Sequence, residues 1–90
     1  MSRELELFIK LYGVDSVTDE QIERFYKELF QLKEKEERVI RLKYGLDDGL
    51  PKTLKIIGEE LNLTPQRIRQ IELKAIRRLR HPWRRKRIFE

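Results

Sequence analysis

Two amides and three cations gather within residues 66–74, and their spacing suggests one face of a helix. They are Gln66, Arg67, Arg69, Gln70 and Lys74, and apolar residues alternate with them at three- and four-residue steps. A Gln side chain can pair with adenine through two hydrogen bonds, and an Arg side chain can do the same with guanine. These residue types therefore favour contact with base edges in DNA. The simpler alternative is the solvated polar face of a surface helix.

The segments that must position this stripe are two short helices joined by a tight turn. Thr53 is expected to cap the first helix, TLKIIGEEL. Thr64 followed by Pro65 is expected to start the second, which runs to about Arg80. Between them, Asn62 tolerates the left-handed backbone that such a turn requires. These are the proportions of a helix-turn-helix, whose second helix reaches base edges with its N-terminal residues.

Charge is unevenly distributed along the chain, although the net charge is only +5. Residues 1–40 contain 7 Lys and Arg against 10 Asp and Glu, whereas residues 41–90 contain 14 against 6. A basic half of this kind suits a polyanion such as nucleic acid. Backbone N–H groups at Thr53 and Leu54 open a helix and can hold a phosphate. The alternative is a well-solvated surface, because 41% of all residues are charged.

Other segments also have the apolar periodicity of helices. Residues 3–12 form the first, which ends before Gly13 and places four apolar side chains on one side: Leu5, Phe8, Ile9 and Tyr12. Thr18 and Gln21 form a capping box at the start of the second. Its apolar stripe comprises Ile22, Phe25, Tyr26, Leu29, Phe30 and Leu32. Residues 32–45 form the third, with Gly45 as its terminator.

The tail at residues 83–90 is short and basic, and we expect it to be frayed. No convincing strand pattern is found. The sequence therefore predicts an all-α fold, a small helical domain of about four to five helices containing a helix-turn-helix.

Residues 32–82 closely resemble region 4 of housekeeping-type bacterial sigma factors, the promoter-recognition subunits of RNA polymerase. The strongest pieces are RVIRLKYGLDDG, TLKIIGEEL and RIRQIELKAIRRLRHP. The resemblance implies a module that recognises a promoter minus-35-type element in double-stranded DNA. It also implies an apolar groove that grips the flap-tip helix of the polymerase beta subunit, with activators or anti-sigma factors as further partners.

The resemblance carries over to particular positions of this chain. The base-reading helix holds Gln66, Arg67, Arg69, Gln70 and Lys74. Phosphate contacts fall on Lys35, Lys43, Thr53, Leu54 and Arg77. Contacts with activators or upstream DNA fall on Arg77, Arg78, Arg80 and His81. The partner groove is assigned to Phe25, Leu29, Tyr44, Leu46 and Leu79, most of which suit a core equally well.

This chain departs from the family pattern at three places. The family usually has Arg then Glu where Pro65 and Gln66 stand, so base preference should change by about 1–3 kcal/mol per lost contact. Leu73 replaces a small residue near the DNA face, where it either touches a thymine methyl or shields the helix. Nothing in the chain resembles the sigma region that melts the downstream element, so this chain alone should not open DNA.

The resemblance divides the chain into an extra amphipathic helix at residues 1–17, a sigma region 4-like module at 18–82 and a basic tail at 83–90. Two interpretations of the first segment stay open. ELFIKLYGVDSV faintly resembles the flap-tip helix and would fold back into the groove, or it is an ordinary extra helix that covers exposed core.

Catalysis and cofactor binding are not expected. The chain has no Cys, and its single His81 has no nucleophile or triad partner. Its paired acids lack the clustering of a metal site, and there is no Gly-rich phosphate loop. No apolar run approaches the roughly 20 residues of a membrane span, and the N-terminus lacks a signal-peptide pattern. We therefore expect a cytoplasmic, non-enzymatic protein without cofactor or metal.

Two other functions compete with promoter recognition. One is a polymerase-flap or anti-sigma interaction protein that does not read DNA, which Pro65 and Gln66 slightly favour. The other is an unrelated helix-turn-helix repressor, which needs a dimer surface that the sequence does not reveal.

Overall fold

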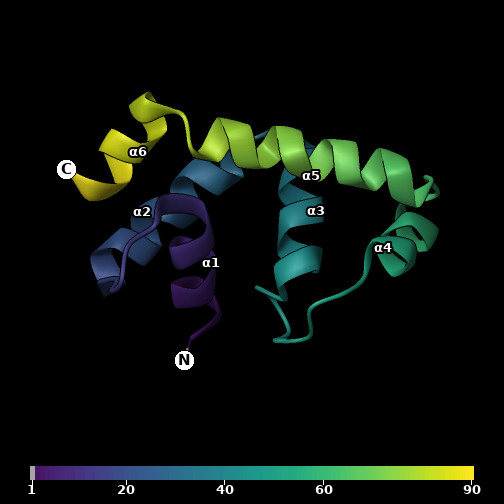
Figure 1. The fold of residues 1–90 in the computed structure, drawn as a ribbon, viewed down its shortest axis with the longest axis horizontal. Coiled ribbons are helices and arrows are strands. Elements are labelled where there is room, and N and C mark those ends of the chain that lie inside the picture. Colours follow the sequence, from purple (N-terminus) through teal and green to yellow (C-terminus); the bar gives the residue numbers. More distant parts are fainter. Residues whose placement is uncertain (1) are drawn as a thin grey trace.

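Short capping signals set the helix boundaries. The computed structural model describes residues 2–90 and forms six helices there, without a strand (Figure 1). They are α1 (Arg3–Tyr12), α2 (Asp19–Phe30), α3 (Glu34–Tyr44), α4 (Leu54–Leu61), α5 (Pro65–Leu79) and α6 (Pro82–Phe89). The predicted all-α class is confirmed. The structure has more helices than the expected four to five, because residues 82–89 of the tail also form a helix.

The predicted caps are present. The Thr18 hydroxyl accepts from Gln21 N at 3.1 Å, and the Gln21 side chain accepts from Thr18 N at 3.0 Å, which completes the capping box. Gly13 and Gly45 end α1 and α3 in the left-handed conformation, with φ of 67° and 63°. At Gly45 a side chain is also excluded by space, because an added Cβ would lie 2.7 Å from the backbone nitrogen of Pro51.

Two hydrophobic cores lie along α5, the long helix that crosses the top of Figure 1. The larger core joins α1, α2, α6 and one residue of α3, Ile40, to the C-terminal half of α5. It contains Leu7, Phe8, Leu11, Tyr12, Phe25, Leu29, Leu32, Ile40, Ala75, Leu79 and Ile88. The smaller core joins α3 and α4 to the N-terminal half of α5, and contains Val39, Ile57, Ile68 and Ile71. One continuous helix therefore connects both parts of the molecule.

The apolar face predicted for the first helix is partly wrong. Phe8 and Tyr12 are buried as expected, but Leu7 and Leu11 complete the buried face, and Ile9 is 42% exposed. The predicted and the observed apolar faces share Phe8 and Tyr12, and the residues of both faces have the three- and four-residue spacing of a helix. Packing against α2 and α5, rather than the local pattern, selects the stripe that includes Leu7.

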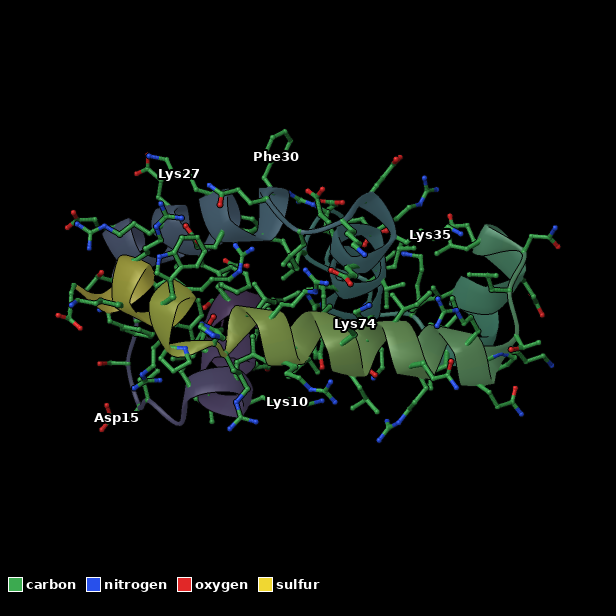
Figure 2. The ribbon with its side chains drawn as sticks, turned by 90° about the horizontal axis from the view of Figure 1, so that it is seen from above. Lys10, Asp15, Lys27, Phe30, Lys35 and Lys74 are labelled. Atoms are coloured by element: carbon green, nitrogen blue, oxygen red, sulfur yellow. The ribbon has the colours of Figure 1, made fainter. Side chains whose placement is uncertain are left out.

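Phe30 also departs from the prediction. It is the last residue of α2, and its side chain is 74% exposed. Figure 2 shows it projecting from the body of the molecule. The chain turns at Gln31, so the stripe continues inward through Leu32 instead.

The prediction of a frayed C-terminal tail is wrong. His81 caps α6 by accepting a hydrogen bond from Trp83 N at 3.2 Å, and Pro82 occupies the first helical turn. Ile88 is fully buried, and the Arg84 guanidinium lies 3.1 Å from the buried Glu28 carboxylate of α2. The tail folds because its apolar residue and its charges find partners far away in sequence. Within residues 2–90, each helix is too short or too polar to cross a lipid bilayer.

Candidate nucleic-acid interface

The turn between α4 and α5 has the backbone that the sequence predicts. Asn62 ends α4 with φ 60° and ψ 44°, the left-handed conformation. The Thr64 hydroxyl caps α5 by accepting from Arg67 N at 3.1 Å, and Pro65 lies in the first turn. Ile57 and Ile68 are fully buried between the two helices and α3. The helix-turn-helix is therefore held by both local caps and a shared core.

Gly58 is a structural residue of this motif that the sequence analysis missed. It is buried inside α4, and an added Cβ would lie 2.5 Å from the carbonyl oxygen of Leu63. Leu63 N donates to the Gly58 carbonyl at 2.8 Å, so the turn lies directly against this glycine. A glycine within a helix costs about 1 kcal/mol relative to alanine, and that local cost was the available signal.

The outward face of α5 is polar and carries no exposed carboxylate. All five predicted base-reading residues, Gln66, Arg67, Arg69, Gln70 and Lys74, are exposed. The one acid of residues 65–79, Glu72, is only 2% exposed. Its Oε2 accepts a hydrogen bond from the Tyr44 hydroxyl at 2.9 Å. The buried position of Glu72 leaves the face to amides and cations.

Tyr44 remains a hydrogen-bond donor over a wide pH range. Burial, reinforced by the adjacent Glu72 carboxylate, raises the pKa of Tyr44 well above its usual value. Lys43 Nζ and Arg69 Nη1 each lie 4.0 Å from a Glu72 oxygen. These two cations offset part of the Glu72 charge, while its Oε1 has no hydrogen-bond partner within residues 2–90.

A cleft of about 270 Å³ lies between the start of α3 and the side of α5. Its lining residues are Lys33, Glu34, Lys35, Glu36, Arg67, Ile71 and Lys74. Figure 2 labels Lys35 and Lys74, which reach this cleft from the two helices. Among residues 2–90, no side chain caps the α3 N-terminus at Lys33. An uncapped helix start beside several cations suits a phosphate.

Glu36 limits the positive charge of this cleft. It is buried, and its Oε2 lies 3.5 Å from Arg78 Nε. Its Oε1 has no hydrogen-bond partner within the described part of the chain. The ion pair with Arg78 offsets part of the negative charge below the cleft.

The residues predicted to contact phosphate are not gathered in one place. Lys35 joins Arg67 and Lys74 at the cleft. Lys43 is half-buried, with its Nζ 5.5 Å from the centre of the Tyr44 ring and close to Glu72. Thr53 and Leu54 stand at the start of α4, where the Thr53 hydroxyl already accepts from Ile56 N at 3.2 Å.

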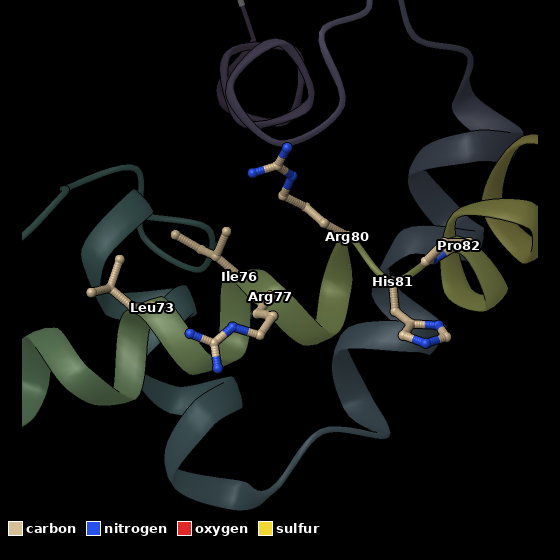
Figure 3. Close-up of a pocket in the computed structure, with 6 residues that line it drawn as sticks. All are labelled: Leu73, Ile76, Arg77, Arg80, His81 and Pro82. Carbon is tan, nitrogen blue, oxygen red and sulfur yellow. The ribbon is translucent and has the colours of Figure 1, made fainter.

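Arg77 lies in a separate, open hollow of about 550 Å³ at the C-terminal end of α5. Figure 3 shows its lining, which comprises Leu73, Ile76, Arg77, Arg80, His81 and Pro82. Leu73 is one of the more exposed large apolar residues of the chain. The Arg80 side chain points toward α1 in this view. The hollow therefore combines cations with apolar surface beside the outward polar face of α5.

The five residues predicted to form a partner groove do come together, but under a cover. Phe25, Leu29 and Leu79 are fully buried in the larger core, and Tyr44 and Leu46 pack against it. The side chains of α1 belong to the same core. In this structure the five side chains are therefore packed as core and covered by α1.

Taken together, the tight turn, the carboxylate-free face of α5 and the cationic cleft define a small helix-turn-helix module of the nucleic-acid-binding class. The model of the family described as sigma-70, region 4 matches residues 29–81, more than half of the chain. The chain belongs to this family.

Curated sigma factors are similar to a large part of the chain. RNA polymerase sigma factor SigA of Clostridium acetobutylicum is 53% identical over 66 residues, which cover 73% of this chain and 18% of that protein. SigA of a Bacillus species is 56% identical over 57 residues, or 63% and 15%. SigA of a Nostoc species is 59% identical over 56 residues, or 62% and 14%. The chain spans less than a fifth of the length of these relatives.

Proposed function

We propose that this chain is a sigma region 4-like module that recognises a promoter minus-35-type element and docks on the beta flap of RNA polymerase. The observation that carries the proposal is the exposed amide-and-cation face of α5 in a well-formed helix-turn-helix. The sigma factor relatives support promoter DNA and RNA polymerase as partners. The function is binding without catalysis, and its setting is the bacterial cytoplasm.

Base reading would fall to the N-terminal half of α5. This end of a recognition helix enters the major groove in a helix-turn-helix complex. The Arg67 guanidinium donates to Gln70 Oε1 at 3.3 Å, so the two side chains hold each other before DNA arrives. The amide nitrogen of Gln70 would then be the group left to donate to an acceptor such as a purine N7.

Phosphate anchoring would use the cleft between α3 and α5. Lys35, Arg67 and Lys74 line it, and the free N–H groups at the start of α3 add a partial positive charge. A DNA backbone strand in this cleft would fix how far α5 enters the groove. Lys43 would contribute less, because its ammonium group is already near the Glu72 carboxylate.

Base preference should differ from that of the family at the first turn of α5. Pro65 has no side chain that can hydrogen-bond a base, and Gln66 is neutral where the family usually has Glu. A Gln amide favours adenine, whereas a carboxylate accepts from cytosine. We therefore propose that the preferred element changes at the base pair opposite Gln66.

We propose that the chain is divided into one binding module and two short terminal segments. Residues 18–82 would form the DNA- and polymerase-binding module, with 1–17 and 83–90 as additions at its two ends. Activators or upstream DNA would meet the C-terminal end of α5, where Arg77, Arg80 and His81 line the open hollow and Arg78 lies nearby in the same helix.

Binding to labelled duplexes over a salt series tests the proposal. We expect a minus-35-type duplex to bind more tightly than a scrambled duplex of the same composition. The logarithm of the binding constant should fall steeply with the logarithm of salt concentration, by about 0.9 for each phosphate contact. Equal affinity for both duplexes would count against sequence reading. Binding of a flap-tip peptide without any duplex binding would instead support the interaction protein that does not read DNA.

A further inference from the structure

Helix α1 lies outside the part of the chain that matches the family, yet it covers a face of the matched part. The family match begins at residue 29, whereas α1 ends at Tyr12. Leu7, Phe8 and Leu11 of α1 are buried in the larger core together with Leu29 and Leu79 of the matched part. The matched module alone would therefore expose an apolar face at this position.

Helix α1 is held in place by noncovalent contacts with three other helices. The Tyr12 hydroxyl donates to the Leu79 carbonyl at 2.9 Å, in a buried hydrogen bond. Arg85 Nη1 donates to the Tyr12 carbonyl at 3.3 Å. The Phe8 ring lies 5.2 Å from the Phe25 ring, centre to centre. Side-chain packing and three hydrogen bonds, the third from the Tyr26 hydroxyl to Glu4 Oε2 at 3.5 Å, thus fix α1 to α2, α5 and α6.

The connection after α1 is short and partly packed against the larger core, and separate local signals define the helices on its two sides. Gly13 ends α1 in the left-handed conformation, and α2 begins with its own capping box at Thr18 and Gln21. The start of α1 is also independent, because Leu5 N donates to the Ser2 hydroxyl at 3.0 Å. Helix α1 is therefore a locally defined unit at the end of a short connection.

We propose that α1 is a displaceable cover of the polymerase-docking face, which competes in cis with the helix that polymerase offers. The inference rests on the proposed docking of this face on the beta flap. The competing helix must be short and amphipathic, and must supply an aromatic and two further large side chains in place of Phe8, Leu11 and Tyr12. The free chain is then closed toward polymerase, while its DNA-reading end at the smaller core stays exposed.

Competition of this kind predicts that weakening α1 strengthens partner binding. If only a small fraction of molecules has α1 displaced, the apparent dissociation constant equals the intrinsic one divided by that fraction. Tyr12→Phe removes the hydrogen bond to Leu79 and keeps the ring, so it should raise the open fraction by about tenfold. Ser2→Ala removes the cap of α1 far from the covered face, and should raise it by about fivefold.

The test measures binding of a synthetic flap-tip helix peptide from a bacterial beta subunit to the full chain. Tyr12→Phe and Ser2→Ala should bind the peptide about tenfold and fivefold more tightly than the unchanged chain. Ser2→Asn keeps a capping side chain and is the matched control, with unchanged affinity. Amide hydrogen exchange in the same samples should show that the peptide removes protection from α1 and leaves α4 and α5 protected.

The outcomes separate this inference from the proposed function. Equal affinity in all four proteins, or peptide binding with α1 still protected, would overturn the cover and leave flap docking in place. If no protein binds the peptide, both the cover and the proposed flap docking are wrong. The duplex measurements on the same proteins then decide separately whether DNA is read.

Discussion

Gln70 and Lys74 lie about one turn apart on α5, yet we expect their loss to affect DNA binding differently. Gln70→Ala would remove a proposed base contact, so it should cost about 1–3 kcal/mol on the preferred duplex and little on a scrambled one. Lys74→Ala would remove a proposed phosphate contact, so it should weaken both duplexes alike and reduce the salt slope by about 1.

Salt titrations of the two variants on both duplexes measure this difference. Ile9→Ala is a suitable control, because Ile9 is exposed on α1, away from the recognition face. A uniform loss for Gln70→Ala would mean that Gln70 positions the helix and does not read a base.

The buried Tyr12 hydroxyl should make the free energy of unfolding depend on pH in the alkaline range. Burial raises the pKa of Tyr12 well above its usual value of about 10, although Arg85 opposes this shift. Because the pKa of Tyr12 is higher in the folded state than in the unfolded state, the stabilisation from the buried neutral Tyr12 is fully present below pH 10. This stabilisation is lost as the pH rises toward the folded pKa. In that window the free energy of unfolding should fall by up to about 1.4 kcal/mol per pH unit from this residue.

Denaturant unfolding between pH 9 and 11.5 checks the alkaline prediction. Tyr12→Phe should be less stable near neutral pH and should lose stability less steeply above pH 10. Equally steep curves for the two proteins would mean that tyrosine ionisation at this position does not control the loss.

Single residues also explain which parts of the site could be predicted. The exposed stripe of α5 follows from helical spacing and from Thr64, whose cap fixes the register. Gly58 was missed because its role depends on the carbonyl oxygen of Leu63. The partner of Glu72, Tyr44, lies 28 positions earlier in the chain, and local patterns carry no information about such a pair.

At the scale of helices, α2 and α6 are joined by a buried ion pair that can be broken from one side. Glu28 is buried, and Arg84 lies 3.1 Å from it, with Arg87 at 3.8 Å. Arg84→Ala leaves the Glu28 carboxylate with its more distant and more exposed partner. The expected loss in free energy of unfolding is about 3 kcal/mol, by analogy with other buried pairs.

Replacing both partners separates charge from packing. The double variant Glu28→Gln with Arg84→Met keeps the volume and removes both charges, so it should recover most of the loss. Thermal or urea unfolding measures both variants. If Arg84→Ala costs no more than the ~0.5 kcal/mol of an ordinary surface change, the pair does not hold α6.

The same helices show where sequence patterns reach their limit. The helices of the matched module were predicted almost to the residue, because Thr, Pro, Asn and Gly mark their ends locally. The recognition-type helix was expected to end at about Arg80, and α5 does end at Leu79, but His81 and Pro82 then start a further helix, α6. What keeps α6 folded is contact with α2, through Ile88 and Glu28, and neither contact leaves a local signal.

On the scale of the whole molecule, we expect the two cores to unfold as one cooperative unit, because α5 contributes to both. Ile68 and Ile71 belong to the smaller core, and Ala75 and Leu79 to the larger. We expect Leu29→Ala, a cavity in the larger core, to lower the free energy of unfolding by about 2–5 kcal/mol. Because unfolding of a domain this small is expected to be two-state, the most protected amides of α4 should lose the same amount.

Native-state hydrogen exchange measures that coupling directly. Unchanged protection in α4, together with reduced protection in α2 and α6, would show that the cores open separately. The surface substitution Glu23→Ala in α2 serves as a control, since this side chain is exposed.

The 15 residues of α5 also act as a rod of about 22 Å. Its far end is gripped by α1 and α6, while its near end presents Gln66 and Gln70 to solvent. Whatever clamps the far end sets the angle at which the near end would enter a DNA groove. Replacing α1 by another helix at this end would therefore change the angle of α5. Under the proposed function, the preferred DNA element would then depend partly on side chains that never approach a base.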